Sequence, residues 1–205
     1  MKTATPGDAR TNQAARRAVL RLASNCHYEA RHTRQVTRLA LQLFDALRSL
    51  HGLGEEERFR LRCAAMLHDI GWIEGRKAHH KTALRLIRES PLLPFDARER
   101  LIIGSVARFH RKAPPEASHE HYAALAPSDR KIVCVLAGLL RVADGLDRSH
   151  GSLIKKTACK IRPEKIIVRC AVDRPAEEER RAAQAKSELF EQVFQRKLEI
   201  EWRVA

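Results

Sequence analysis

The sequence predicts a mainly α-helical protein that ends in a small β-β-α-β unit. From about residue 8 to residue 150, apolar residues recur at steps of three and four, which is the spacing of one helix face. After Gly151 apolar and polar residues alternate instead, as they do in half-buried strands. We therefore expect a helical domain at residues 8–150 and a small α/β subdomain at residues 151–205.

Six helices are expected in the first part. The second, from residue 29 to residue 50, has the clearest periodicity, and the sequence His-Gly-Leu-Gly ends it. The third begins near Gly54 and runs to Gly71, where a glycine can adopt the left-handed conformation that ends many helices. The other four are expected at residues 8–25, 81–89, 96–110 and 128–149.

Three strands and one helix are expected after Gly151. The stretch ACKIRPEKIIVRCAV alternates around a Pro-Glu-Lys turn, which is typical of a β-hairpin. The stretch PAEEERRAAQAKSELFEQVFQRK is typical of one charged helix, and LEIEWRV of a final strand. So small a sheet leaves its edges exposed, which makes a homodimer interface at this unit a further interpretation that stays open.

The composition is that of an ordinary globular protein. Of its 205 residues 44% are hydrophobic and 31% are charged. No run approaches the roughly 18 apolar residues of a membrane-spanning helix. The first residues lack the apolar core of a secretory signal, so we expect a cytoplasmic protein. The five cysteines are an odd number without a Cys-x-x-Cys pair, which predicts reduced thiols.

The net charge of +14, carried mostly by arginine, favours anionic partners. A solvated basic surface explains the charge equally well, so both interpretations remain open. Arginines spread along the first two predicted helices could contact nucleic acid. However, only 5% of the residues are aromatic, so stacking platforms for bases are scarce. Nucleic acid is therefore the disfavoured partner.

Several residues of metal-binding type occur on apolar helix faces. At about 100° per residue, His32 shares a face with apolar residues of the second predicted helix. His68, His110 and Asp144 follow apolar residues of their own helices at the same spacing. One buried histidine is more often a hydrogen-bonded core residue than a ligand, but four such residues from four helices predict a metal site. Mixed imidazole and carboxylate ligands suit Mn²⁺, Fe²⁺, Co²⁺, Ni²⁺ or Zn²⁺.

The same residues carry a family resemblance. Their order, His32, then His68–Asp69, then Asp144, resembles the HD superfamily of metal-dependent phosphohydrolases, which is named for its His-Asp doublet. More narrowly, about residues 15–205 are similar to the HD domain at the C-terminal end of exopolyphosphatases and guanosine-pentaphosphate phosphohydrolases. The stretches that carry this likeness are HTRQVTRLALQLFDAL, AAMLHDIGW, HHKTALRLI, ARFHRKAPP and LLRVADGLDRSH. The resemblance implies an HD-domain helical bundle built around one or two divalent metal ions.

The resemblance also implies which residues act. The ligands of a first ion would be His32, His68, Asp69 and Asp144, and those of a second ion Asp69, His80 and His110. His79 is the neighbouring alternative to His80, His68 and Asp69 would be catalytic, and Mg²⁺ joins the candidate metals. Cations close to these ligands in sequence are candidate substrate contacts: Lys81, Arg111, Lys112, Arg141 and Arg148.

The implied activity is that of a metal-dependent phosphohydrolase. A metal-activated water would cleave a phosphoester or phosphoanhydride in a nucleotide-like or polyphosphate-like substrate. The partner would thus be a phosphorylated small molecule or polyphosphate.

Two departures from the family favour an alternative. Full-length members carry N-terminal domains of an actin-like fold that bind and hydrolyse the phosphate chain, and 205 residues leave no room for these. In addition, Thr82 stands where the family often has a histidine, and Trp72 where many HD enzymes have a lysine. The alternative is a non-catalytic regulatory HD module that binds polyphosphate or an alarmone.

Overall fold

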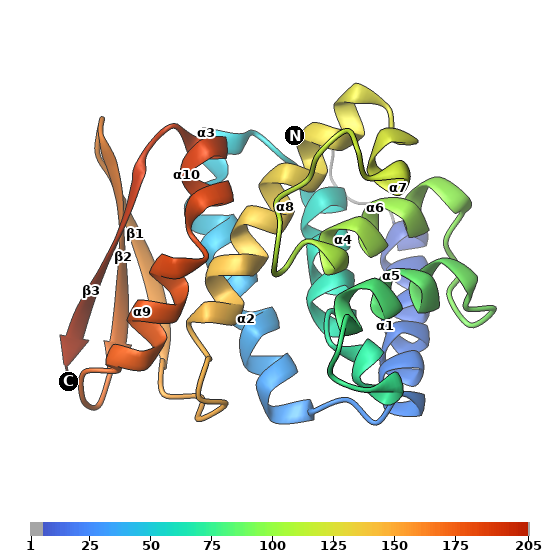
Figure 1. Cartoon of the computed structure of the whole chain (residues 1–205), viewed down its shortest axis with the longest axis horizontal. Coiled ribbons are helices and arrows are strands. Elements are labelled where there is room, and N and C mark those ends of the chain that lie inside the picture. The colour runs from blue at the N-terminus through green and yellow to red at the C-terminus, as the bar shows by residue number, and fades with distance from the viewer. Residues whose placement is uncertain (1–5, 205) are drawn as a thin grey trace.

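Helices dominate the structure, and a three-stranded sheet lies at one end of it (Figure 1). The structure is a computed structural model that describes residues 6–204, with side chains described from residue 12 onward. Helices α9 (Glu177–Ala185) and α10 (Glu188–Phe194) lie between the sheet and the long helix α8 (Pro127–Gly145). The predicted mainly α fold is confirmed.

Each of the six helices expected before residue 150 is present. Helix α6 begins where the sequence predicts it, because Asp96 and Glu99 form a capping box in which each side chain accepts a hydrogen bond from the other residue's N–H. The one-turn helix α7 (Glu120–Ala123) is an addition to the prediction. The remaining elements of this part are α1 (Pro6–Asn25), α2 (Ala30–Ala46), α3 (Arg48–His51), α4 (Glu55–Leu67), the 3-10 helix η1 (Ile70–Glu74), α5 (His79–Glu89) and α6 (Ala97–Arg108).

The second predicted helix is broken, so its expected end at residue 50 is wrong. Helix α2 stops at Ala46, and Leu47 leaves the helical region with φ −107° and ψ 11°. Leu47 is fully buried, and its N–H is shared between the carbonyls of Leu43 and Phe44 at 3.0 and 3.3 Å. The chain then makes one further turn, α3, which ends at Gly52 with φ 65°. Packing of Leu47 into the core therefore interrupts a periodicity that looks continuous in the sequence.

The third predicted helix ends early, and Gly71 does not cap it. Helix α4 stops at Leu67, and the glycines with positive φ in the described chain are Gly52 and Gly75. Gly71 instead lies against the start of α5, where an added Cβ would be only 2.0 Å from the carbonyl oxygen of His79. The missing side chain thus lets two backbone segments approach closely. This contact brings the start of α5 next to the His68–Asp69 pair.

The C-terminal unit has the predicted hairpin and final strand. Strands β1 (Lys156–Ile161) and β2 (Lys165–Val172) are antiparallel, and β3 (Lys197–Val204) pairs with β2 in parallel. The single charged helix expected between them is wrong, because the helix breaks at Lys186 into α9 and α10. Lys186 has φ −107° and ψ 4°, and its ammonium group forms an ion pair with Asp144 of α8. A tertiary contact thus ends α9.

Small residues allow the C-terminal helices to pack closely against α8. An added Cβ at Gly145 would be 2.5 Å from Cα of Ala183, and one at Gly138 would be 3.3 Å from Cα of Phe190. One continuous group of buried apolar residues includes members of both parts of the chain. The division into domains at residue 150 stays a prediction. The close packing has one clear consequence, which is that the end of α9 lies beside the end of α8.

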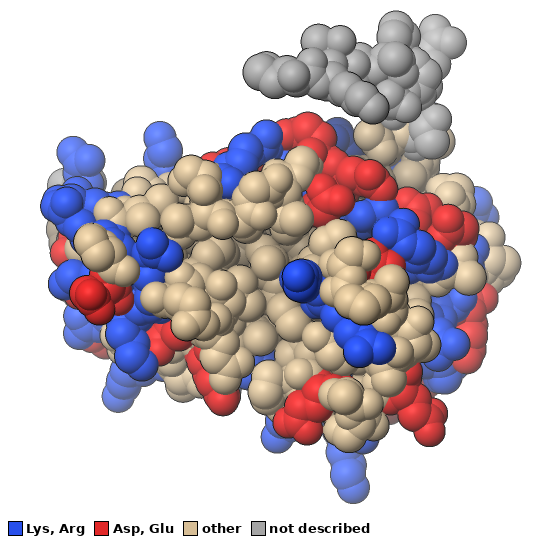
Figure 2. Space-filling view, turned by 90° about the horizontal axis from the view of Figure 1, so that it is seen from above, with Lys and Arg blue, Asp and Glu red and all other residues tan. Residues whose placement is uncertain are grey.

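The surface of the molecule differs from one face to another. On the outer face of the sheet, ion pairs join Lys165 to Glu199 at 2.5 Å and Arg169 to Glu201 at 2.9 Å. Figure 2 shows a broad area with few charged side chains on the face seen from above in Figure 1. A groove of about 560 Å³ between α3, α8 and α10 is lined in part by apolar side chains, namely Leu50, Leu53, Ile132, Val135, Val193 and Phe194. The homodimer interface considered from the sequence stays a prediction.

No helix within residues 6–204 combines the length and the apolar character that crossing a bilayer requires. All five cysteines are free thiols.

Candidate metal centre

Three predicted ligands from separate helices form one group. His32 lies in the first turn of α2, His68 directly follows α4, and Asp144 lies in the last turn of α8. Their ligand atoms lie within 4.8 Å of one another. Asp144 Oδ1 is 3.4 Å from His32 Nε2 and 3.9 Å from His68 Nε2. The spatial convergence expected from the sequence is thus present for these three residues.

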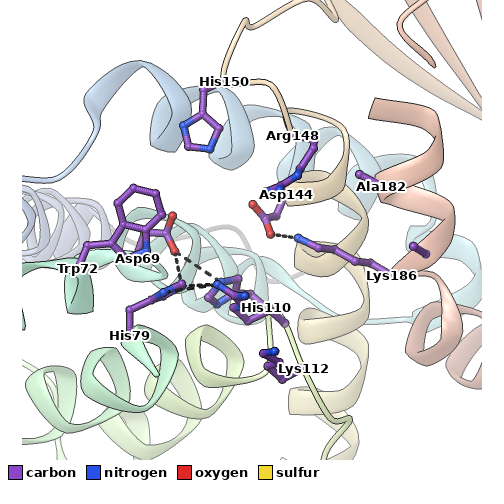
Figure 3. A pocket seen from close by; sticks show the side chains of 12 residues that line it. Asp69, Trp72, His79, His110, Lys112, Asp144, Arg148, His150, Ala182 and Lys186 are labelled. Carbon is purple, nitrogen blue, oxygen red and sulfur yellow. Dashed lines mark hydrogen bonds and ion pairs between the residues drawn. The ribbon is translucent and has the colours of Figure 1, made fainter. Parts of the chain in front are cut away.

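Asp69, His79 and His110 form a second group, whose ligand atoms also lie within 4.8 Å of one another. Asp69 Oδ1 is 3.1 Å from His79 Nε2 and 3.5 Å from His110 Nε2. His79 opens α5, and His110 follows the end of α6. Figure 3 shows the three side chains pointing toward one another.

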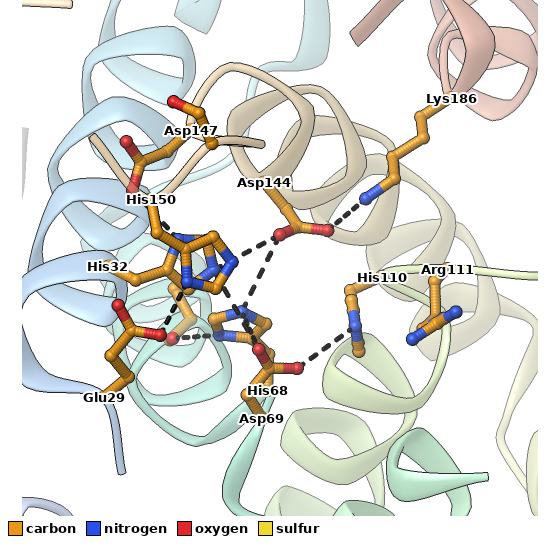
Figure 4. A network of polar contacts seen from close by, with 12 residues as sticks. Glu29, His32, His68, Asp69, His110, Arg111, Asp144, Asp147, His150 and Lys186 are labelled. Atoms are coloured by element: carbon orange, nitrogen blue, oxygen red, sulfur yellow. Dashed lines mark hydrogen bonds and ion pairs between the residues drawn. The ribbon is translucent and has the colours of Figure 1, made fainter. Parts of the chain in front are cut away.

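Asp69 joins the two groups. Its Oδ1 faces the second group, whereas its Oδ2 lies 3.4 Å from His68 Nε2 and 3.9 Å from His32 Nε2. Figure 4 shows the Asp69 and Asp144 carboxylates among the histidine rings. One carboxylate therefore serves both groups, which is the arrangement of a ligand that bridges two ions.

Each histidine ring is fixed through Nδ1, so that Nε2 faces the centre. Nδ1 of His32 donates to Asp147 Oδ2 at 2.9 Å. Nδ1 of the other three rings donates to backbone carbonyls, at 2.8 Å for His68, 3.0 Å for His79 and 2.6 Å for His110. This is the tautomer and orientation in which protein histidines bind metals.

Several inward atoms of the centre are buried without a partner. The described side chains make no hydrogen bond to His32 Nε2, His68 Nε2 or Asp69 Oδ1. Leaving a buried polar atom unpaired costs about 1–3 kcal/mol. A divalent cation held by these atoms would remove that cost, so the donor set fits one metal ion or two.

Charge in the centre also favours cations. Burial alone would raise the pKa of the Asp144 carboxyl, but the Lys186 ammonium and the His32 ring outweigh burial and hold this pKa well below its usual range. Burial alone would lower the pKa of His32, but the carboxylates of Asp144 and Asp147 raise it to about 10. The same carboxylates favour any cation at Nε2, whether a proton or a metal ion. Burial lowers the pKa of His110 to about 3, so that its ring is neutral at pH 7, as a metal ligand must be.

A pocket of about 350 Å³ opens over the centre. Its two sides differ in chemistry, as Figure 3 shows. On one side lie the rings of Trp72 and His150, whose centroids are 6.2 Å apart with 21° between the ring planes. The other side is cationic, and its lining residues are Arg111, Lys112, Arg148 and Lys186.

The family model for Ppx/GppA phosphatase, domain III, matches residues 15–189. The chain belongs to this family. The matched range contains both groups of candidate ligands, the lining of the pocket and most of the C-terminal unit. The family relation and the pocket therefore concern the same part of the molecule.

The structure corrects one predicted ligand of the second ion. Adjacent helical residues point about 100° apart, and it is His79, not His80, that faces Asp69. His80 is buried with 6% of its surface exposed, and its Nδ1 has no hydrogen-bond partner. Burial, aided by the charge of Arg108, lowers the pKa of His80 to about 3. Its neighbour His79 lies in the group with Asp69 and His110 instead.

Three of the five predicted substrate contacts line the pocket, namely Arg111, Lys112 and Arg148. Lys81 is exposed and does not line it. In α5, Lys81 follows His79 by two residues, which places it on the far side of the helix. Lys81 is therefore placed away from the pocket over the metal centre.

Arg141 does not line the pocket either. It is buried with 5% of its surface exposed, and its guanidinium donates to the carbonyls of Phe109 at 3.1 Å, Lys112 at 2.9 Å and Lys186 at 3.4 Å. Its position on the packed side of α8 directs the side chain to carbonyls that the ends of α6 and α9 leave free. Arg141 therefore holds together the two segments that carry Lys112 and Lys186.

The sequence did not predict four residues that contact a candidate ligand or line the pocket. Lys186 and Asp147 each contact a candidate ligand, whereas Trp72 and His150 line the pocket. The stretch LLRVADGLDRSH holds a weak signal for two of them, because Asp147 follows Asp144 by three residues and His150 follows by six. No comparable signal marks Lys186 within its charged helix.

Proposed function

We propose that this chain is a metal-dependent phosphohydrolase of the HD type. Its substrate is nucleotide-like or polyphosphate-like, and the bond cleaved is a phosphoester or phosphoanhydride. The observation that carries this proposal is the position of Asp69, with one carboxylate oxygen facing each of two groups of imidazole nitrogens.

Two sets of side chains would hold the ions. The first set is His32, His68, Asp69 and Asp144, and the second is Asp69, His79 and His110. A pair of divalent ions supplies a nucleophile at neutral pH and stabilises charge on a phosphoryl group. The buried surroundings keep the carboxylates and rings in fixed positions, and Asp147 fixes the ring of His32.

The cationic side of the pocket suits a phosphate chain. Arg111, Lys112 and Arg148 come from two different segments and line the same hollow. Arginine forks match phosphate oxygens, and lysine adds a point charge. Trp72 and His150 offer a flat surface beside the ligands, on which a base of a nucleotide-like substrate could stack.

Metal content of the purified protein tests the proposal. We expect two transition-metal ions per chain, about one ion after His79→Ala, and two after His80→Ala, the matched control one residue away. Turnover of a nucleotide panel and of tripolyphosphate with Mn²⁺ should follow the same order. A chain that retains no transition metal with every ligand position intact contradicts the proposal.

The second candidate is a non-catalytic module that binds polyphosphate or an alarmone. Thr82 and Trp72, which depart from the related sequences, favour it. The variant Asp69→Asn separates the two candidates. Loss of hydrolysis with phosphate-ligand affinity largely unchanged supports the enzyme, whereas ligand binding without hydrolysis in the wild type supports the module.

A further inference from the structure

A second hollow, the α2–α4 groove, is separate from the metal centre. It has a volume of about 340 Å³, and no residue that lines it also lines the pocket over the metal centre. Helices α2 and α4 supply its walls. The lining residues that matter here are Arg34, Thr37, Arg38, Asp45, Arg58 and Arg62.

The α2–α4 groove contains more positive charge than its single carboxylate neutralises. Four arginines line it, and Asp45 is held by Arg58 through two hydrogen bonds of 2.7 Å. Arg38 donates to the carbonyl of Ile154 at 2.6 Å. Neither Arg34 nor Arg62 forms an ion pair with any described side chain. Because the partners of Arg38 are neutral oxygens, three guanidinium groups of the groove, those of Arg34, Arg38 and Arg62, lack an anion among the described side chains.

Arg62 lies in especially unfavourable surroundings for a cation. Burial lowers the pKa of its guanidinium, and the positive charges of Arg16 and Arg58 lower it further. Partly buried cations are normally paired with an anion, because desolvation is costly. A bound anion would satisfy Arg62 and its neighbours together.

Thr37 gives independent support for a ligand. Its side chain lines the groove between Arg34 and Arg38 on α2, and only 4% of the residue's surface is exposed. The hydroxyl oxygen is buried and has no hydrogen-bond partner among the described residues. An unpaired buried hydroxyl is destabilising unless a ligand or water completes it. A phosphoryl oxygen is an acceptor for this hydroxyl, as it is for the neighbouring guanidinium groups.

We propose that the α2–α4 groove is a second anion site, which binds the phosphate chain of a small molecule away from the metal centre. Guanidinium forks and a hydroxyl donor are the groups that hold phosphoryl oxygens. No aromatic side chain lines the groove, so it offers no stacking surface for the bases of a nucleic acid. The two helices that form the groove also position candidate metal ligands, because His32 lies on α2 and His68 follows α4.

Calorimetric titration of the full chain with inorganic tripolyphosphate tests this site. The double variant Arg34→Glu/Arg62→Glu should lose one binding event or bind it at least about tenfold more weakly. The control Arg88→Glu/Arg162→Glu makes the same change of net charge at exposed positions outside the groove. We expect it to weaken tripolyphosphate binding less than about threefold. Equal losses in the two double variants would overturn the proposal, since they indicate attraction by net charge alone.

The variant Thr37→Val tests whether misfolding explains a loss of tripolyphosphate binding. Because the hydroxyl has no protein partner, the valine variant should unfold at an unchanged urea midpoint while binding tripolyphosphate about threefold more weakly. A nucleoside triphosphate should bind the groove as tripolyphosphate does if only the phosphates are held. Tighter binding of an oligodeoxynucleotide than of tripolyphosphate overturns the proposal. The test needs no turnover, so failure of the proposed activity leaves it decisive.

Discussion

His32 and Asp147 form a buried hydrogen bond of 2.9 Å between residues 115 positions apart in the sequence. Asp147 is fully buried, and its second oxygen accepts a hydrogen bond from the N–H of Ser152 at 2.7 Å. Both carboxylate oxygens are therefore occupied, and the carboxylate cannot turn. The bond fixes the ring of His32 with Nε2 toward Asp144 and Asp69.

Asp147→Ala should weaken metal binding about 10- to 100-fold, the usual cost of losing a residue that orients a metal ligand. The metal affinity of Asp147→Asn should fall between those of the alanine variant and the wild type, because the asparagine amide oxygen can still accept a hydrogen bond from His32. Competition with a metal chelator, followed by metal analysis, measures the change. An alanine variant that binds metal like the wild type would show that the ring of His32 is oriented by other contacts.

Arg141 should act on both stability and substrate binding without touching substrate. Arg141→Lys loses the fork that reaches the carbonyls of Phe109 and Lys112, so we expect about 2 kcal/mol lower unfolding free energy. Displacement of the Lys112 segment should raise KM more than it lowers kcat. Arg148→Lys is the contrasting variant, since Arg148 is exposed and lines the pocket. It should raise KM while the urea midpoint stays constant.

Gly71→Ala should damage the second group of ligands through the backbone. The new methyl group would lie 2.0 Å from the carbonyl oxygen of His79, so the start of α5 must move. We expect about 3 kcal/mol lower unfolding free energy and loss of the second metal ion, with the first retained. In Gly54→Ala the nearest atom is a side-chain oxygen at 3.5 Å, and this control should change neither quantity by much.

The sequence predicts the elements of this fold better than their ends. Periodicity locates every long helix, since burial of one face determines it. The breaks at Leu47 and Lys186 follow instead from contacts that a local pattern does not contain. Leu47 packs into the core, and Lys186 pairs with Asp144, 42 positions away.

The candidate site, too, could be predicted where a local pattern determines a residue's position and not where a tertiary contact does. His32, His68 and Asp144 could be inferred because each lies on an apolar face of its own helix. The choice between His79 and His80 depends on the rotation of α5 about its axis, which the contact of Gly71 with the first turn of α5 helps to set. Spacing along the chain carries no such information, and the resemblance to a family favoured His80, whereas it is His79 that faces Asp69.

The stability of the fold should depend on pH through His51. Its Nε2 donates to the carbonyl of Phe44 at 2.9 Å, and its Nδ1 accepts from the N–H of Leu53 at 3.0 Å, which requires a neutral ring. Burial, opposed only in part by the bond to Phe44, lowers the pKa of His51 below 6.5. As the pH falls through 6.5, the unfolded chain takes up a proton before the folded chain does, so stability present above that pH is lost. Urea unfolding of wild type and His51→Gln from pH 7.5 to 5 should show the difference between them shrinking; a constant difference would exclude a role for protonation.

Trp72 should decide between nucleotide-like and polyphosphate-like substrates. The rings of Trp72 and His150 lie nearly parallel and side by side on one side of the pocket (Figure 3), where a base could stack while its phosphates reach the cationic side. Stacking of one base on an aromatic side chain is worth about 1–3 kcal/mol. Trp72→Leu should therefore lower kcat/KM for a nucleoside triphosphate by about 5- to 150-fold and leave tripolyphosphate hydrolysis nearly unchanged. Trp202→Phe, at the far strand β3, is the matched control and should change neither rate. Equal losses on both substrates after Trp72→Leu would mean that the indole supports His79, which it contacts edge-on at 5.6 Å between ring centroids, and does not bind a base.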